Sequence, residues 1–173
     1  MIYDLEEDSE FFYLIEEYLE GYSLYALIVN QGPIQEAEAV RYGMQVCGLV
    51  AYMHSACEIP ILHLDLQPNN LIICNGTVKL IDFDAARLYK PYQSKDTQAI
   101  GTMGYAAPEQ YGINQTDERT DIYAIGVLMN VMLTGQPPEI RLYNGRLKRV
   151  IVKCTQTIPD NRYQNVKELK RNL

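Results

Sequence analysis

Three polar side chains in this sequence are spaced so that they could act together on a phosphate group. Asp65 and Asn70 lie in the segment 63–70, HLDLQPNN, and Asp82 follows Asn70 by twelve residues, in Asp82-Phe83-Asp84. Amide and carboxylate oxygens, here of Asn70 and Asp82, are the ligands that Mg²⁺ takes when it is bound with a nucleotide. A further carboxylate, Asp65, could orient an attacking hydroxyl and accept its proton.

A tight turn brings these residues toward one place. Asn75-Gly76 stands between two apolar runs, LIIC and TVKLI, and Asn-Gly is the strongest short-range signal for a β-hairpin. Counting outward from this turn pairs Cys74 with Thr77 and Leu71 with Leu80. Asn70 then pairs with Ile81, and Asp82 lies diagonally across the mouth of the hairpin. Taken singly, Asp65 also suits a turn cap, and Asn70 also suits a strand end.

The motifs in and after this hairpin resemble those of eukaryotic-type protein kinases, notably the bacterial serine/threonine kinases. HLDLQPNN looks like the catalytic loop H-R-D-L-x-x-x-N, Asp82-Phe83-Asp84 like D-F-G, and Ala107-Pro108-Glu109 like A-P-E. The segments that follow in the family resemble 101–110, 120–138 and 159–164. The resemblance covers essentially all 173 residues.

The resemblance implies an α+β, mainly α-helical fold, with a single domain over residues 1–173. Residues 1–19 would be the last small-lobe strands and the hinge, and residues 20–173 the large lobe. It also implies ATP and Mg²⁺ as cofactors, Asp65 as the base, and Asn70 and Asp82 as metal ligands. The residues expected to contact the nucleotide are Glu17, Leu19, Gln67 and Ile72.

Several family features are missing or replaced. The first glycine is Gly21, and Arg41 is the only Lys or Arg before Asp65, so we find no glycine-rich loop and no phosphate-pairing lysine. The chain thus begins, by this comparison, inside the small lobe. Leu64, Gln67 and Asp84 replace an arginine, a lysine and a glycine of the pattern. Glu16 falls at the gatekeeper position, which is usually apolar.

The residues that support the fold match the family better. Asp121 matches the aspartate that holds the catalytic-loop backbone, Thr102 matches a threonine that is linked to the catalytic aspartate, and Glu109 with Arg162 matches a buried ion pair. His63 is expected to be a packed structural histidine and His54 a helix-end residue.

Hydrophobic periodicity and capping residues predict the remaining elements. We expect strands near 2–5 and 11–16, a short helix over 24–30 capped by Ser23, and a helix over about 35–56. The activation-loop equivalent is 85–106. A nearly all-apolar helix should run from 115–116 to 134, followed by two or three shorter helices.

Composition limits the class of protein further. Hydrophobic residues make up 47% of the chain, enough for a core, and no apolar run reaches the ~18 residues of a membrane-spanning helix. Four cysteines without a CxxC pair indicate reduced, buried thiols, which favours a cytoplasmic location. The net charge of −7 argues against nucleic acid as a partner.

Charge is distributed unevenly along the chain. Residues 1–40 hold ten Asp or Glu and no Lys or Arg, whereas residues 141–173 hold nine Lys or Arg and two Asp or Glu. Two solvated faces of opposite charge explain this asymmetry, and so would docking of charged partners.

Three functions remain open. The chain could be the large lobe of an ATP- and Mg²⁺-dependent serine/threonine kinase that needs a small lobe from elsewhere. It could be a pseudokinase that acts as a protein-binding scaffold, or a degraded fragment. A two-stranded hairpin is marginal alone, so its apolar residues should be covered by a second chain, as in a homodimer, by rearranged packing, or by an absent lobe. These residues are Tyr3, Leu5, Phe11, Phe12 and Tyr13.

Overall fold

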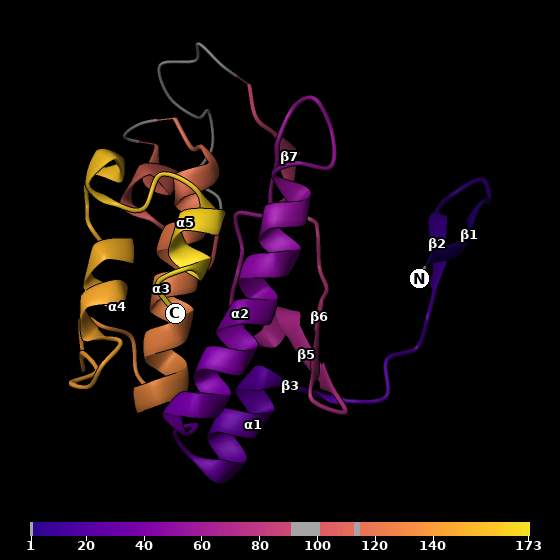
Figure 1. The fold of residues 1–173 in the computed structure, drawn as a ribbon. Helices are drawn as coiled ribbons and strands as arrows, with labels where there is room; N and C mark the ends of the chain where they lie inside the picture. The colour runs from indigo at the N-terminus through magenta and orange to yellow at the C-terminus, as the bar shows by residue number, and fades with distance from the viewer. Residues whose placement is uncertain (1, 91–100, 113–114) are drawn as a thin grey trace.

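A computed structural model describes residues 2–90, 101–112 and 115–173 of the chain. Most of these residues form a helical body with a small sheet on one side, and an N-terminal hairpin stands apart from it (Figure 1). The mainly helical α+β fold expected from the sequence is confirmed. Part of the predicted activation-loop segment, 91–100, lies outside the described residues.

Helix α3 (Glu118–Thr134) forms the centre of the body. Every residue from Thr120 to Thr134 is buried, as expected for a helix that is hydrophobic all round. Helix α2 (Glu36–Met53), helix α4 (Lys148–Cys154) and helix α5 (Val166–Lys170) pack around it or against one another.

The shorter α1 (Leu24–Gln31) begins at Ser23, whose Oγ accepts the Ala26 N–H at 3.1 Å. The predicted cap at Ser23 is therefore confirmed. Short 3₁₀ turns at Pro68–Asn70, Pro108–Tyr111 and Pro159–Asn161 complete the helical elements.

Three short strands form the sheet beside α2. Strand β5 (Leu71–Cys74) lies between β3 (Tyr22–Ser23) and β6 (Thr77–Leu80), and all neighbours are antiparallel. The β5–β6 register pairs Cys74 with Thr77 and Leu71 with Leu80, as the Asn75-Gly76 turn predicts. A second small pair joins β4 (Ile61–Leu62) to β7 (Arg87–Leu88).

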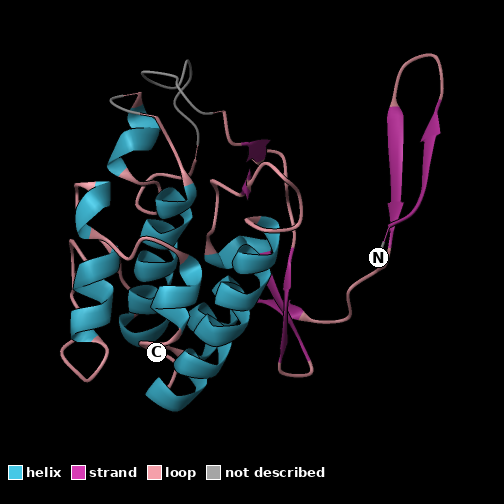
Figure 2. Ribbon diagram, turned by 45° about the horizontal axis from the view of Figure 1, so that its top comes forward, coloured by secondary structure: helices cyan, strands magenta, loops and turns pink. Residues whose placement is uncertain are grey.

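The N-terminal hairpin contains β1 (Ile2–Glu7) and β2 (Phe12–Glu16), paired antiparallel. Every residue of both strands is exposed, and Figures 1 and 2 show the hairpin separated from the helices by an extended linker. Rearranged packing within the described chain therefore does not cover it. The exposure follows from its isolation, because no other described element packs as a second layer on either face.

Some element bounds and side-chain environments differ from expectation. Helix α2 ends at Met53, since His54 is its C-cap, and α3 begins at Glu118 because Asp117 caps it. Cys57 is exposed in the turn after α2, and Cys74 is half-buried. Among the described residues, no helix is long and apolar enough to cross a membrane.

Candidate active site

Asp65 occupies the centre of a hydrogen-bonded cluster. Its Oδ1 accepts the Thr102 hydroxyl at 2.7 Å and the Thr102 N–H at 3.0 Å. Its Oδ2 accepts hydrogen bonds from Nε2 of Gln67 and from Nδ2 of Asn70, each at 3.0 Å. Gln67 also donates to the Thr102 hydroxyl at 2.8 Å. The four bonds fix the carboxylate in one orientation, and they use about the number of lone-pair positions that a carboxylate has.

Asp121 of α3 holds the backbone that leads to Asp65. Oδ2 and Oδ1 of Asp121 accept the N–H groups of His63 and Leu64 at 3.0 and 2.9 Å. Asp121 is fully buried, so these bonds offset the cost of removing its charge from water. Leu64 has φ 64°, a conformation that costs a non-glycine residue of order 1–3 kcal/mol and persists only where the surrounding contacts impose it. Its carbonyl accepts Nε2 of Gln110 at 2.7 Å.

His63 is fully buried, as expected for a packed structural histidine. Its Nδ1 accepts the Asp65 N–H at 3.3 Å, and its ring meets Phe83 edge to face with centroids 5.4 Å apart. Burial lowers the pKa of His63, although the carboxylates of Asp121 and Asp65 act in the opposite direction. The neutral ring is the form that accepts the Asp65 N–H.

Asn70 and Asp82 come to the mouth of the β5–β6 hairpin from its two strands. The Ile81 N–H donates to the Asn70 carbonyl at 2.9 Å, so the predicted pairing of these residues is present. Asn70 is buried and its Nδ2 faces Asp65, whereas Asp82 is exposed with φ 61° and its Oδ1 accepts the Asp84 N–H at 3.4 Å. Within the described residues no hydrogen bond to Oδ1 of Asn70 is formed, which leaves an amide oxygen and a carboxylate as the donor set that Mg²⁺ prefers.

The four residues expected to contact a nucleotide do not share one cavity. Glu17 and Leu19 line a cavity of about 750 Å³ with Glu16, Cys74 and Lys79. The same cavity is not lined by Gln67, which turns to Asp65, or by Ile72 of β5.

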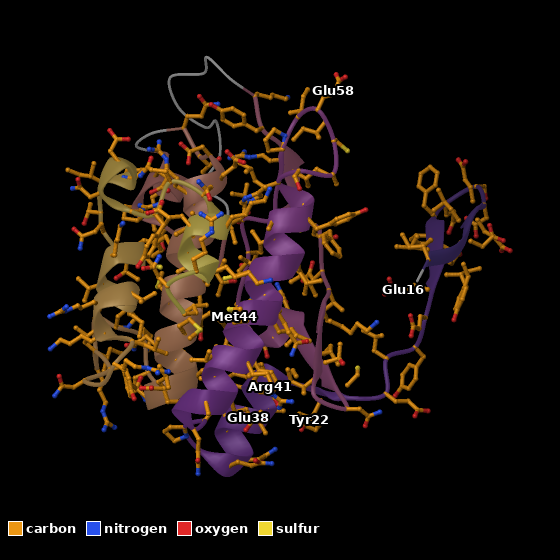
Figure 3. All side chains as sticks on the ribbon, in the orientation of Figure 1. Glu16, Tyr22, Glu38, Arg41, Met44 and Glu58 are labelled. Carbon is orange, nitrogen blue, oxygen red and sulfur yellow. The ribbon has the colours of Figure 1, made fainter. Side chains whose placement is uncertain are left out.

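The predicted gatekeeper, Glu16, lies on the exposed strand β2, away from the helical body (Figure 3). Gly21 holds the linker close to β5, because a Cβ there would come within 2.5 Å of the Ile73 carbonyl oxygen.

Two contacts that support the site differ in how well the sequence indicates them. Glu109 and Arg162, predicted as a buried pair, form two hydrogen bonds of 2.7 and 2.8 Å and are each 2% exposed. Nε2 of His54 donates to Oδ2 of Asp121 at 2.8 Å. The sequence indicates only a helix end for His54, because a contact with a residue 67 positions away leaves no local signal.

The comparisons with known proteins agree with this arrangement. The sequence model of the protein kinase domain matches residues 1–172. The chain is 26% identical to serine/threonine-protein kinase PrkC of Bacillus subtilis (strain 168) over 99% of its own length, and 30% identical to serine/threonine-protein kinase PknB of Mycolicibacterium smegmatis over 93%. It is 34% identical to serine/threonine-protein kinase A of Synechocystis sp. over 79%.

The chain therefore belongs to the protein kinase family. It spans 30%, 30% and 28% of the lengths of those three relatives.

Proposed function

We propose that this chain is the large lobe of a serine/threonine protein kinase, with phosphoryl transfer from ATP to protein hydroxyls when a small lobe is supplied and weak or no activity alone. The supporting observation is the fixed carboxylate of Asp65, which Thr102 and Asn70 hold in one orientation. Positioning of this kind, together with electrostatic stabilisation, accounts for most catalysis of phosphoryl transfer.

Asn70 and Asp82 would hold Mg²⁺ in this proposal, and the bound ion would neutralise charge on the phosphates. The linker residues Glu17 and Leu19 would meet the nucleotide base from the cavity beside Lys79. Gln67 and Ile72 are the other two residues that would contact the nucleotide.

The second candidate is a pseudokinase scaffold, and the state of Asp65 favours it. Gln67 takes one of the carboxylate's acceptor positions and contributes no positive charge. Asp65 would have to give up a hydrogen bond before it could accept a substrate hydroxyl. Leu64 and Asp84 also lack the charge or flexibility of the family pattern. The partner would be a protein, or a second copy joined through the exposed hairpin.

The four cysteines are free thiols. Free thiols are typical of reducing compartments, so we propose a cytoplasmic location.

Calorimetric titration with ATP and Mg²⁺ separates these candidates. We expect heat at millimolar nucleotide that Asp82→Asn abolishes. The matched control is Asp84→Asn, which removes the same charge two residues away and should leave binding equal or stronger, because a carboxylate no longer stands beside the phosphates. Absence of heat from the unaltered chain would exclude the kinase proposal for this chain and leave the scaffold.

A further inference from the structure

A cavity of about 550 Å³ lies on the helical body, away from the candidate active site. It is bounded by the end of α2, the first residue of α3, and α5. Its lining includes His54, Glu118, Lys167, Glu168 and Arg171. This volume is within the range of small-molecule sites in proteins.

Two cations face this cavity from one side of α5. Lys167 and Arg171 are four residues apart, a spacing that places side chains on one face of a helix, and both are exposed. In the described part of the chain, neither side chain forms an ion pair or a hydrogen bond. Both are thus available to an anion.

The carboxylates of the cavity do not cancel these charges. Glu168 is already engaged, with Oε1 on Lys153 at 3.3 Å and Oε2 on the Gln164 N–H at 3.0 Å. Glu118, at the start of α3, is the other carboxylate of the lining. The uncommitted groups are therefore two cations and one carboxylate.

His54 contributes an imidazole side chain to the same lining. Its side chain is 6% exposed, and its Nε2 is bound to Oδ2 of Asp121. Nδ1 has no hydrogen-bond partner among residues 2–90, 101–112 and 115–173. Nδ1 is not an enclosed atom, and His54 lines the cavity, so this nitrogen is open to a hydrogen bond from a ligand there.

We propose that this cavity binds a phosphomonoester that also carries an ammonium group, as O-phosphoserine does. Lys167 and Arg171 hold the phosphate, Nδ1 of His54 accepts a hydrogen bond from the P–OH of the phosphate monoanion because its Nε2–H already donates to Asp121, and Glu118 meets the ammonium. The volume exceeds the need of a bare phosphate, which leaves room for the group that carries it.

Such a ligand acts on the candidate active site through two contacts. His54 binds Asp121, and Asp121 holds the backbone N–H groups of His63 and Leu64. A ligand that fixes the His54 ring therefore stabilises the segment that ends in Asp65. The site is an effector site, and its occupancy is measurable without any kinase activity.

Calorimetric titration with O-phosphoserine and with inorganic phosphate, without Mg²⁺, tests the proposal. We expect O-phosphoserine to bind more tightly than inorganic phosphate. Lys167→Ala with Arg171→Ala should weaken binding by about a hundredfold, since each of the two charged hydrogen bonds contributes roughly tenfold. The matched control is Lys148→Ala with Arg149→Ala, two exposed cations of α4 outside the lining, which should leave affinity within about twofold.

His54→Gln adds a test of the ring nitrogen. Glutamine can still donate to Asp121 but has nothing at the place of Nδ1, so affinity should fall several-fold while the fold is kept. In the unaltered chain, the NMR signals of the His54 ring should move on titration. No binding at millimolar O-phosphoserine, or equal binding by the Lys167 and Arg171 double variant, overturns the proposal.

Discussion

Asp65 and His63 show how strongly individual side chains in this chain depend on their neighbours. The Asp65 carboxylate accepts four hydrogen bonds, and His63 accepts the Asp65 N–H through a ring nitrogen. Protonation of His63 at Nδ1 would remove that acceptor. The state of one buried ring is therefore coupled to the position of the proposed base.

The pH dependence of stability should report this coupling. Burial lowers the pKa of His63 below its ordinary 6.5, so the folded state binds this proton less readily than the unfolded state does. The stability from neutral His63 is then fully present above pH 6.5 and is lost as pH falls from 6.5 toward the folded pKa, by at most about 1.4 kcal/mol per pH unit.

Denaturant unfolding of the unaltered chain and of His63→Leu, each between pH 7.5 and pH 5, measures this loss of stability. The unfolding free energy of His63→Leu should fall less as pH is lowered, because the other titrating groups act in both proteins and only the contribution of His63 is missing. Parallel curves for the two proteins would contradict the assignment.

The β5–β6 hairpin determines where Asn70 and Asp82 lie. Gly76 has φ 77°, and a Cβ there would come within 3.0 Å of an Arg41 guanidinium nitrogen. Gly76→Ala should therefore destabilise the fold by about 1 kcal/mol.

Gly48, inside α2, provides the matched control. Its nearest neighbour would be Nζ of Lys170 at 3.5 Å, an ordinary contact, so Gly48→Ala should stabilise by up to about 1 kcal/mol. Chemical unfolding of the two variants measures both changes in unfolding free energy, which should have opposite signs. An unchanged stability for Gly76→Ala would mean that the turn does not require positive φ.

Local sequence signals predict the turns and helix caps of these elements well. They do not predict the contacts between residues that are far apart in the sequence. The Asn-Gly turn gave the register of β5–β6, and Ser23 gave the start of α1, because both depend on neighbouring residues. The sequence predicts that α3 begins at 115–116, earlier than the observed Glu118, because Gln115-Thr116 also suits a cap. The bond of His54 to Asp121, and the saturation of Asp65 by Gln67, come from residues that only the tertiary fold brings together.

The N-terminal hairpin is the part of the protein that no other described element packs against. Leu5 pairs with Leu14, both strands have open edges, and the apolar side chains of 2–15 are 41–72% exposed. Exposed strand edges with apolar faces tend to pair with another chain. Eight acidic residues within 1–20 oppose self-pairing, so association should strengthen as salt screens them.

Sedimentation velocity over a range of protein and salt concentrations tests this expectation. We expect the sedimentation coefficient to rise with protein concentration, and to rise further at 1 M salt, where the screening length is about 3 Å. Leu5→Lys with Phe12→Lys places two charges on one face of the hairpin and should keep the chain monomeric. Tyr52→Lys is the matched control, because Tyr52 is 72% exposed on α2, and it should associate as the unaltered chain does. A monomer under all conditions would show that the hairpin does not join two copies, and would leave a different protein chain as its expected cover.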